Sequence, residues 1–214
     1  DNSENNIFWV TMTDLMTALV LVFMVLFFYT YMTQYYQAIQ EKLEQQKSSE
    51  ALQESLKAQN IDAAVDVSNG IVRIGDLSLF TLNSWVLSPA GKDYLSKFAP
   101  AYLNSLFSNK YMSEHLEKII ITGHTDSQTF VGKYSPDEQY MKNMDLSLKR
   151  AYAVADYMIN TPYNKQNGNK LRKMIVVEGA SFSEPVIING QEDFSKSRRV
   201  ELKLIMKNDS NKNK

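Results

Sequence analysis

The hydrophobic and polar positions change character along the chain, and the first apolar run stands apart. Residues 15–31 read LMTALVLVFMVLFFYTY and are almost entirely apolar. A helix rises about 1.5 Å per residue, so roughly 20 such residues cross the ~30 Å hydrocarbon core of a membrane. Trp9 precedes this run and Tyr35 and Tyr36 follow it, as expected at the two bilayer interfaces. The pattern predicts a transmembrane anchor helix within residues 1–36.

A cleaved signal peptide is the alternative for this apolar run. Such a peptide needs a basic start, a shorter apolar core and small residues at a cleavage site. Here DNSENN opens the chain and TQYYQAIQ follows the run, so neither flank fits. A retained single-pass anchor is the better interpretation. No Lys or Arg lies close to either end of the run, so the positive-inside rule does not predict an orientation.

Residues 37–60 are polar, rich in Gln, Glu, Lys and Ser, and free of Gly and Pro. Four apolar residues have partial helical spacing, too irregular for a heptad repeat: Ile39, Leu43, Leu52 and Leu56. The segment predicts a helical stalk or linker, which either pairs in part with a second copy or is a solvated connector.

From residue 61 the pattern alternates between strands and helices. Asn69-Gly70 separates two short strand-like runs and predicts a hairpin. Ser88-Pro89 supplies an N-cap and a first-turn proline for a helix through Leu95, Phe98 and Leu103. We expect further strands at 118–122, 174–177 and 200–206, and a helix over 146–158 with Leu146, Ala153, Val154 and Tyr157 on its inner face.

These elements predict one domain over residues 61–207 with an α+β fold, a mixed sheet with packed helices. The last residues, 208–214, are low in complexity and are expected to be disordered. Composition narrows the function. The net charge of −1 gives no reason to expect a nucleic-acid partner. There is no cysteine, and His115 and His124 lack companions at metal-ligand spacing, so neither a metal nor another cofactor is expected.

Asp14 is the only Asp, Glu, Lys, Arg or His between residues 6 and 39. An acid on a spanning helix is costly and by default suggests a functional site. Thr11, Thr17 and Ala18 lie one helical turn from it, at offsets of three and four residues. A carboxyl group in apolar surroundings favours its neutral form, so it could load and release a proton. From spacing alone, an interfacial Asp that reaches water is an equal alternative.

The segment from Asp14 to Ala18 reads DLMTA and, with Trp9 before it, resembles the transmembrane motif of the MotB/ZorB family of ion-motor B-subunits. This version of the motif is especially similar to the ZorB branch of the Zorya anti-phage systems. The resemblance implies that Asp14 carries the coupling ion, with Thr11 and Thr17 beside it. It also implies a dimer of this chain inside a pentamer of a multi-span, MotA/ZorA-like A-subunit. The ion is expected to be H⁺ rather than Na⁺.

A second constellation lies in the C-terminal domain. Asp126 leaves the end of a predicted strand, and Arg150 lies in the first turns of a predicted helix. A carboxylate and a planar guanidinium could together bind a small zwitterion, one through its ammonium and the other through its carboxylate. Taken singly, however, each residue has an ordinary alternative as a turn residue or a solvated charge.

The wider pattern resembles the OmpA-like peptidoglycan-binding domain: GHTD at 123–126, NxxLSxxRA at 143–151 and RRVE at 198–201. The resemblance covers roughly residues 71–205. It implies that Asp126 and Arg150 grip the diaminopimelate of a stem peptide, and that Arg199 braces the fold. Residues that would shape the pocket are Thr125, Asn143, Leu146 and Ser147. The interval 127–142 is longer than in compact members of the family, and we expect this loop to reshape or cover the pocket.

Taken together, these features predict a non-enzymatic motor subunit in the cytoplasmic membrane. Its N-terminus would be cytoplasmic and its C-terminal domain periplasmic, bound to peptidoglycan. A Zorya-type defence component is the favoured hypothesis. A flagellar stator subunit and a passive tether between membrane and cell wall are the alternatives.

Overall fold

The computed structural model describes residues 2–81, 83–161 and 168–207. The chain divides into two compact units, Asp1–Glu44 and Gln45–Lys214. The residues after 207, which were expected to be disordered, lie outside the described part.

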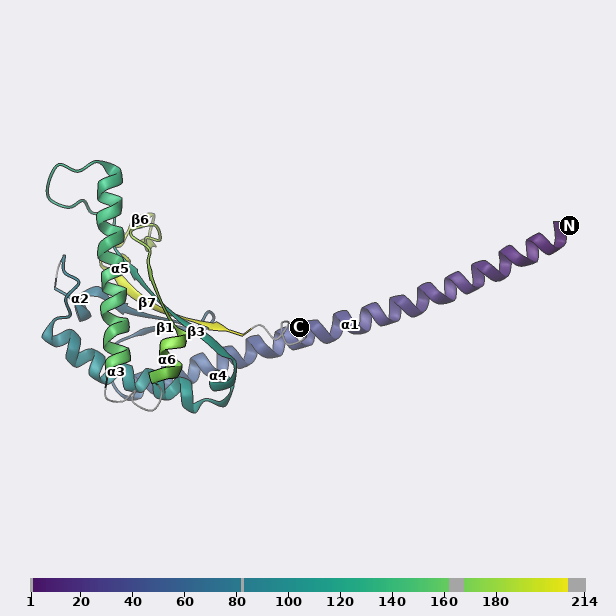
Figure 1. Cartoon of the computed structure of the whole chain (residues 1–214), viewed down its shortest axis with the longest axis horizontal. Coiled ribbons are helices and arrows are strands. Elements are labelled where there is room, and N and C mark those ends of the chain that lie inside the picture. The colour runs from purple at the N-terminus through teal and green to yellow at the C-terminus, as the bar shows by residue number, and fades with distance from the viewer. Residues whose placement is uncertain (1, 82, 162–167, 208–214) are drawn as a thin grey trace. The chain divides into compact units, whose positions relative to one another are not determined.

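The N-terminal unit is formed by helix α1, which runs from Asn2 to Ala58 and continues into the second unit (Figure 1). The sequence of this helix contains no Gly or Pro, so nothing in it breaks the backbone hydrogen bonds. A stretch long and apolar enough to cross a membrane begins at Ile7. The large apolar side chains from Ile7 to Tyr36 are exposed in the single chain. They therefore present a surface suited to lipid or to partner helices.

The end of α1 belongs to the C-terminal unit. Leu52 and Leu56 are each 1 % exposed and lie in the hydrophobic core. The Nδ2 atom of Asn109 donates a hydrogen bond to the hydroxyl of Ser48, 3.2 Å away. The predicted stalk is thus helical to Ala58, and the compact unit begins at Gln45 rather than at the predicted boundary of residue 61. The two leucines, four residues apart on one helical face, explain the earlier start.

The described strands of the C-terminal unit include a five-stranded mixed sheet in the order β1-β2-β7-β3-β4. Strands β3 and β4 are parallel, and the other neighbouring pairs are antiparallel. The predicted hairpin forms β1 and β2, and Gly70 adopts a φ of 66° in the loop between them. The strand bounds are β1 Ala64–Asp66, β2 Ile71–Gly75, β3 Leu116–His124, β4 Ile175–Gly179 and β7 Arg199–Met206.

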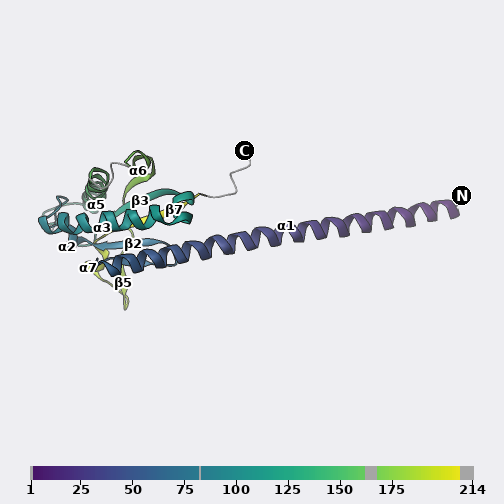
Figure 2. The same ribbon diagram turned by 90° about the horizontal axis from the view of Figure 1, so that it is seen from below.

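Helices pack on this sheet, which confirms the α+β fold. Figure 2 shows α5 (Pro136–Asn160) and α6 (Gly168–Met174) on one side of it. Helix α3 (Pro89–Ser108) begins where Ser88-Pro89 predicted, and the Ser88 hydroxyl accepts a hydrogen bond from the Gly91 N–H at 2.9 Å. Apolar side chains of these helices and of the strands share one core, including Leu95, Phe98, Leu103, Ile119, Ile121, Val154 and Leu202.

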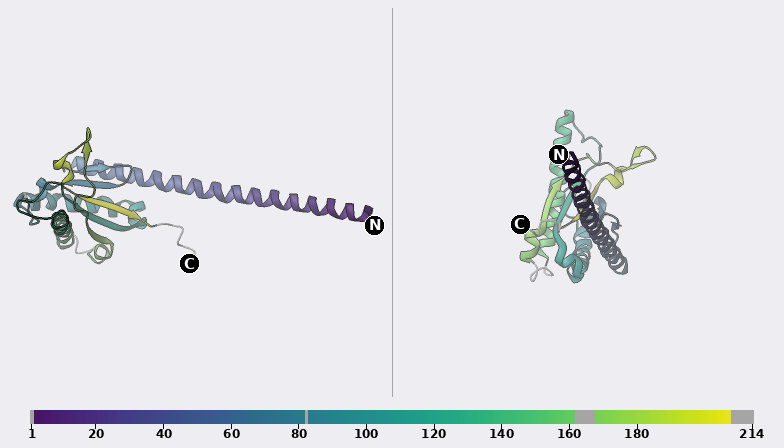
Figure 3. Two further views of the ribbon diagram at one scale, coloured as in Figure 1. Left: turned by 90° about the horizontal axis from the view of Figure 1, so that it is seen from above. Right: turned by 90° about the vertical axis from the view of Figure 1, so that its right-hand side faces the viewer.

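Several elements were not predicted. Helix α5 starts at Pro136, inside the interval 127–142 that was expected to be a loop, because Ser135 and Glu138 form a capping box at its N-terminus. Short helices occur as α2 (Asp76–Leu79), α4 (Lys110–His115) and α7 (Phe194–Ser197). A small hairpin of β5 (Ile187–Ile188) and β6 (Gln191–Glu192) projects from the body of the domain (Figure 3).

Candidate functional site

The threonines near Asp14 use their hydroxyl protons within the helix. Thr17 donates to the backbone carbonyl of Asp14 at 2.8 Å. Thr11 donates to the carbonyls of Ile7 and Phe8, at 3.0 and 2.9 Å. A hydroxyl whose proton is engaged still offers oxygen lone pairs. These oxygens could therefore accept a hydrogen bond from a neutral carboxyl or help to bind a cation.

The second constellation converges on one pocket of about 120 Å³. Asp126 follows the end of β3, where the Thr125 N–H donates to the Ser181 carbonyl at 2.8 Å. Arg150 comes from the middle of α5. Five of the six predicted wall-binding residues line this pocket, together with residues from loops that the sequence did not single out. The full lining is Asn83, Thr125, Asp126, Gln128, Thr129, Phe130, Val131, Asn143, Leu146, Arg150 and Arg198.

Ser147, the sixth predicted residue, lies behind the pocket. It is fully buried, donates to the Met144 carbonyl at 2.9 Å and accepts from the Ser181 N–H at 3.1 Å. A Cβ atom added to Gly123 would overlap the backbone carbonyl of Ser147, so β3 and α5 approach each other as closely as glycine permits. This contact positions the end of β3, and with it Asp126, against the first half of α5.

Arg150 is held from two sides. Its Nη2 atom lies 3.1 Å from the Asp76 carboxylate, and both side chains are 2 % exposed. Its Nε donates to the backbone carbonyl of Ser84 at 2.9 Å. Burial raises the pKa of Asp76 to about 6, against the attraction of Arg150, and burial also lowers the pKa of Arg150. Arg150 is therefore a fixed, desolvated cation at the base of the pocket.

Asp126 has a partner that the sequence did not reveal. The guanidinium of Arg198, just before β7, forms an ion pair with its carboxylate. Arg199, the next residue, donates to Glu201 at 2.7 Å, which also accepts from Arg73 at 2.9 Å. The paired arginines thus separate into one that faces the pocket and one that braces the sheet. Their adjacency in the sequence is the signal that could have drawn attention to both.

The loop before α5 forms one wall of the pocket through Phe130 and Val131. It is tied to the helix by Gln139, whose Oε1 accepts from the Phe130 N–H at 2.9 Å. Asn143 donates to the Gln139 carbonyl at 3.1 Å, one turn further along. The Thr125 hydroxyl is buried and has no hydrogen-bond partner among the described residues. The loop thus narrows the pocket and leaves Thr125 as a polar group available to a ligand.

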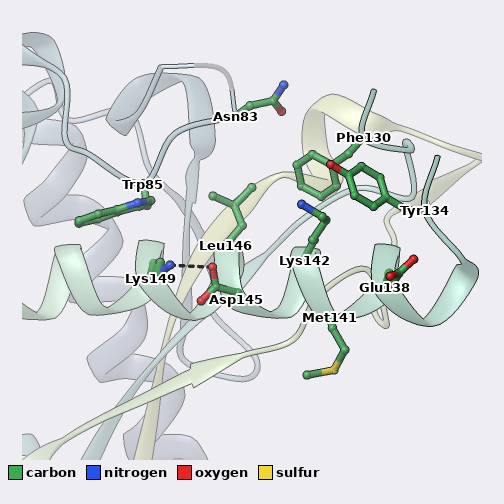
Figure 4. Close-up of a pocket in the computed structure, with 10 residues that line it drawn as sticks. All are labelled: Asn83, Trp85, Phe130, Tyr134, Glu138, Met141, Lys142, Asp145, Leu146 and Lys149. Atoms are coloured by element: carbon green, nitrogen blue, oxygen red, sulfur yellow. Dashed lines mark hydrogen bonds and ion pairs between the residues drawn. The ribbon is translucent and has the colours of Figure 1, made fainter. Parts of the chain in front are cut away.

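A larger hollow of about 530 Å³ lies next to this pocket (Figure 4). Trp85 lies on one side of it, and the rings of Phe130 and Tyr134 lie on the other. Leu146 and Lys142 of α5 lie between them. Sequence reasoning missed this hollow. Its signal would have been the two aromatic residues within the long interval after Asp126.

No family model matches the chain. The Zorya protein ZorB of Escherichia coli strain ATCC 8739 is 31 % identical to it over 215 residues, covering 94 % of this chain and 89 % of the relative. The chain belongs to the ZorB family. A second ZorB, from Escherichia coli O139:H28, is 28 % identical over 210 residues, covering 92 % of this chain and 79 % of that protein.

A solved structure has the same fold as the C-terminal domain of this chain. A MotB-like protein from Desulfovibrio vulgaris superposes with a TM-score of 0.56 at 16 % identity, covering 79 % of this chain and 95 % of that one. The mixed sheet with packed helices is the OmpA-like fold that the motifs predicted. The long apolar helix and the family membership fit a single-pass inner-membrane protein with a periplasmic C-terminal domain.

Proposed function

We propose that this chain is the B-subunit of an ion-driven rotary motor in the inner membrane, in a Zorya-type anti-phage defence system. Membership of the ZorB family is the observation that carries the proposal. Asp14, the only acid between residues 6 and 39, supports it. A passive wall tether needs no acid in its membrane anchor, and a flagellar stator role lacks the support that the ZorB relatives give to defence.

Asp14 carries the coupling ion in this proposal. The helix of one chain pairs with that of a second copy inside a pentamer of multi-span A-subunits, with the N-terminus in the cytoplasm. The membrane potential supplies about 2.3 kcal/mol per charge per 100 mV. Loading of H⁺ neutralises Asp14 and weakens its local interactions, which lets the A-subunit ring advance. The oxygens of Thr11 and Thr17 accept the hydrogen bond of the neutral carboxyl.

The C-terminal domain fixes the motor to peptidoglycan in this proposal. The smaller pocket has room for one end of an amino acid, and it presents a carboxylate and a guanidinium to it. Asp126 takes the ammonium group of diaminopimelate, and Arg150 takes its carboxylate. Arg198 shares Asp126 with the ligand, because it already forms an ion pair with that carboxylate. Leu146 contacts the aliphatic part, while Asn143 and Thr125 offer polar groups.

The motor part is tested with Asp14→Asn in cells that carry the whole defence system. The variant keeps the side-chain shape but cannot carry a proton, so phage protection is lost while the A-subunit still copurifies. Thr30→Ala is the matched control, because Thr30 makes similar helix hydrogen bonds to Leu26 and Phe27. Full protection by Asp14→Asn would favour the passive tether and overturn the motor proposal.

The coupling ion is tested by varying external Na⁺ at fixed pH. Protection that is independent of Na⁺ is the expected result, and strict dependence on Na⁺ would replace H⁺ as the coupling ion. The wall-binding part is tested by sedimentation of the full chain with purified sacculi. Asp126→Asn is expected to stay in the supernatant, whereas Asp93→Asn, an exposed acid paired with Lys97, sediments like the wild type.

A further inference from the structure

The larger hollow borders the smaller pocket. The two share Asn83, Phe130 and Leu146 in their linings. A ligand whose end occupies the smaller pocket would therefore have the larger hollow directly beside it. At about 530 Å³ the larger hollow falls within the size range of small-molecule sites, whereas the smaller, at about 120 Å³, holds only a fragment. Most of an extended ligand would lie in the larger hollow.

Aromatic rings line the two sides of this hollow and remain open to solvent. Trp85 is 46 % exposed and Tyr134 is 40 % exposed. Figure 4 shows the indole of Trp85 across the groove from the phenol of Tyr134. Large aromatic side chains are normally buried for their apolar area, so two that stay open on opposite sides of one hollow are suited to a ligand with apolar faces.

The charged side chains around these rings have interaction partners within the domain. Lys149 pairs with Asp145 at 2.7 Å. Glu138 accepts a hydrogen bond from the Ser135 N–H at 2.7 Å. The Nζ atom of Lys142 lies 4.2 Å from the centre of the Tyr134 ring, a cation–π contact. The groove therefore offers aromatic faces and hydrogen-bonding edges without a strong net charge, which suits a neutral ligand.

We propose that this groove binds the sugar part of peptidoglycan, while the attached stem peptide enters the smaller pocket. The C–H groups on the face of a pyranose ring carry slight positive charge and pack on the negative face of an aromatic ring. Its hydroxyl and acetamido groups reach the polar edges formed by Asn83 and the ion pair of α5. The inference rests on the proposed peptidoglycan binding and adds a second subsite to it.

The two subsites are joined through one backbone segment. Arg150 at the base of the smaller pocket donates to the Ser84 carbonyl, and Trp85 is the next residue. The Val86 N–H donates to the Ser84 hydroxyl at 3.0 Å, which closes a local turn. The arginine that receives the peptide thus also positions the tryptophan that receives the sugar.

The test compares two ligands by calorimetry with the full chain in detergent. One is a disaccharide–tetrapeptide that contains diaminopimelate, and the other is the same tetrapeptide without sugars. The wild type is expected to bind the sugar-bearing ligand roughly tenfold more tightly, the effect of about 1.4 kcal/mol from ring stacking. Trp85→Ala removes this difference and leaves the affinity for the free tetrapeptide unchanged. Trp85→Phe, which keeps a ring, retains most of the difference.

Tyr152→Ala is the matched control, since Tyr152 is an exposed aromatic residue of α5 outside the groove. It is expected to bind both ligands like the wild type. Equal affinity of the wild type for the two ligands, or an equal loss of both in Trp85→Ala, would overturn the sugar subsite. Failure of the wild type to bind either ligand, or unchanged binding by Asp126→Asn, would instead overturn the proposed wall-binding function.

Discussion

The Nε atom of Arg150 donates a hydrogen bond to the backbone carbonyl of Ser84 at 2.9 Å. This bond joins the middle of α5 to a loop more than sixty residues earlier in the chain. Because the same guanidinium also lies against Asp76, the arginine links the base of the pocket to the loop at its rim. A side chain proposed to bind ligand is thus also part of the structure that shapes the site.

We predict that Arg150→Lys keeps the charge but loosens this loop. An ammonium group lacks the planar fork, so it cannot hold Asp76 and the Ser84 carbonyl together, at a cost of about 1–3 kcal/mol. The chain contains two tryptophans, so in a Trp9→Phe background Trp85 alone reports on the loop. Its fluorescence should be quenched more strongly by acrylamide. Arg172→Lys, on α6, should leave the quenching unchanged, and unchanged quenching in Arg150→Lys would contradict the linking role.

The buried residues Asp76 and His124 should give opposite pH dependences. Burial raises the pKa of Asp76 from 3.8 to about 6, so the folded state binds a proton that the unfolded state lacks in this range. The contribution of Asp76 to the free energy of unfolding is therefore lost as pH rises through about 6. Burial, with Arg199 nearby, lowers the pKa of His124 from 6.5 to about 4, so stability from His124 is gained as pH rises from 4 to 6.5.

The two contributions change in opposite directions with pH, so they oppose each other in the wild type. Urea unfolding at pH 4.5, 5.5 and 6.5 checks this. In Asp76→Asn the free energy of unfolding should rise with pH, and in His124→Gln it should fall. Asp93→Asn should follow the wild type. Slopes of the same sign in the two variants would refute the assignment.

Gly123 should not tolerate a side chain. An added Cβ would overlap the Ser147 carbonyl, so Gly123→Ala must push α5 away from β3. We expect a loss of about 3 kcal/mol in stability, together with loss of sacculus binding. Gly75→Ala is the control, because its Cβ would meet only the Ser78 hydroxyl, at 3.9 Å. Thermal unfolding followed by circular dichroism measures both, and a matching melting temperature for the two variants would contradict the close contact.

The end of α1 should behave as part of the C-terminal domain. Leu52→Ala or Leu56→Ala is expected to cost about 2–5 kcal/mol, as for other large-to-small changes in a core. Leu43→Ala, whose side chain is exposed, should have little effect. Correspondingly, a fragment of residues 45–207 should unfold cooperatively and at higher urea than one of residues 61–207. Equal midpoints for the two fragments would show that these helical turns add nothing.

Local signals in the sequence predicted most of the fold. The start of α3 followed from Ser88-Pro89, and the first hairpin followed from Asn69-Gly70, because both depend on residues that are neighbours in the chain. Ser135 and Glu138 form a capping box that is equally readable, so the early start of α5 was predictable in principle. The weak amphipathic spacing of Leu52 and Leu56 did not reveal which surface would cover them.

The candidate site was only partly predictable for the same reason. Motifs indicated Asp126 and Arg150, and the structure brings both to one pocket. Asp126 pairs with Arg198 and Arg150 pairs with Asp76. Both partners lie far away in the sequence, and only the tertiary fold brings them close. The aromatic groove likewise depends on a loop conformation, and neither Trp85 nor Tyr134 belongs to a motif.

Strand β7 is the last strand of the described residues, yet it lies between β2 and β3 in the middle of the sheet. In the proposed topology the part of the chain after the anchor is exported, and β7 then crosses the membrane after β2 and β3. Until it is inserted, β2 and β3 have no common neighbour, and Arg198 is not in place beside Asp126. In the proposed function, binding to the wall through Asp126 would therefore wait until β7 has been exported and inserted.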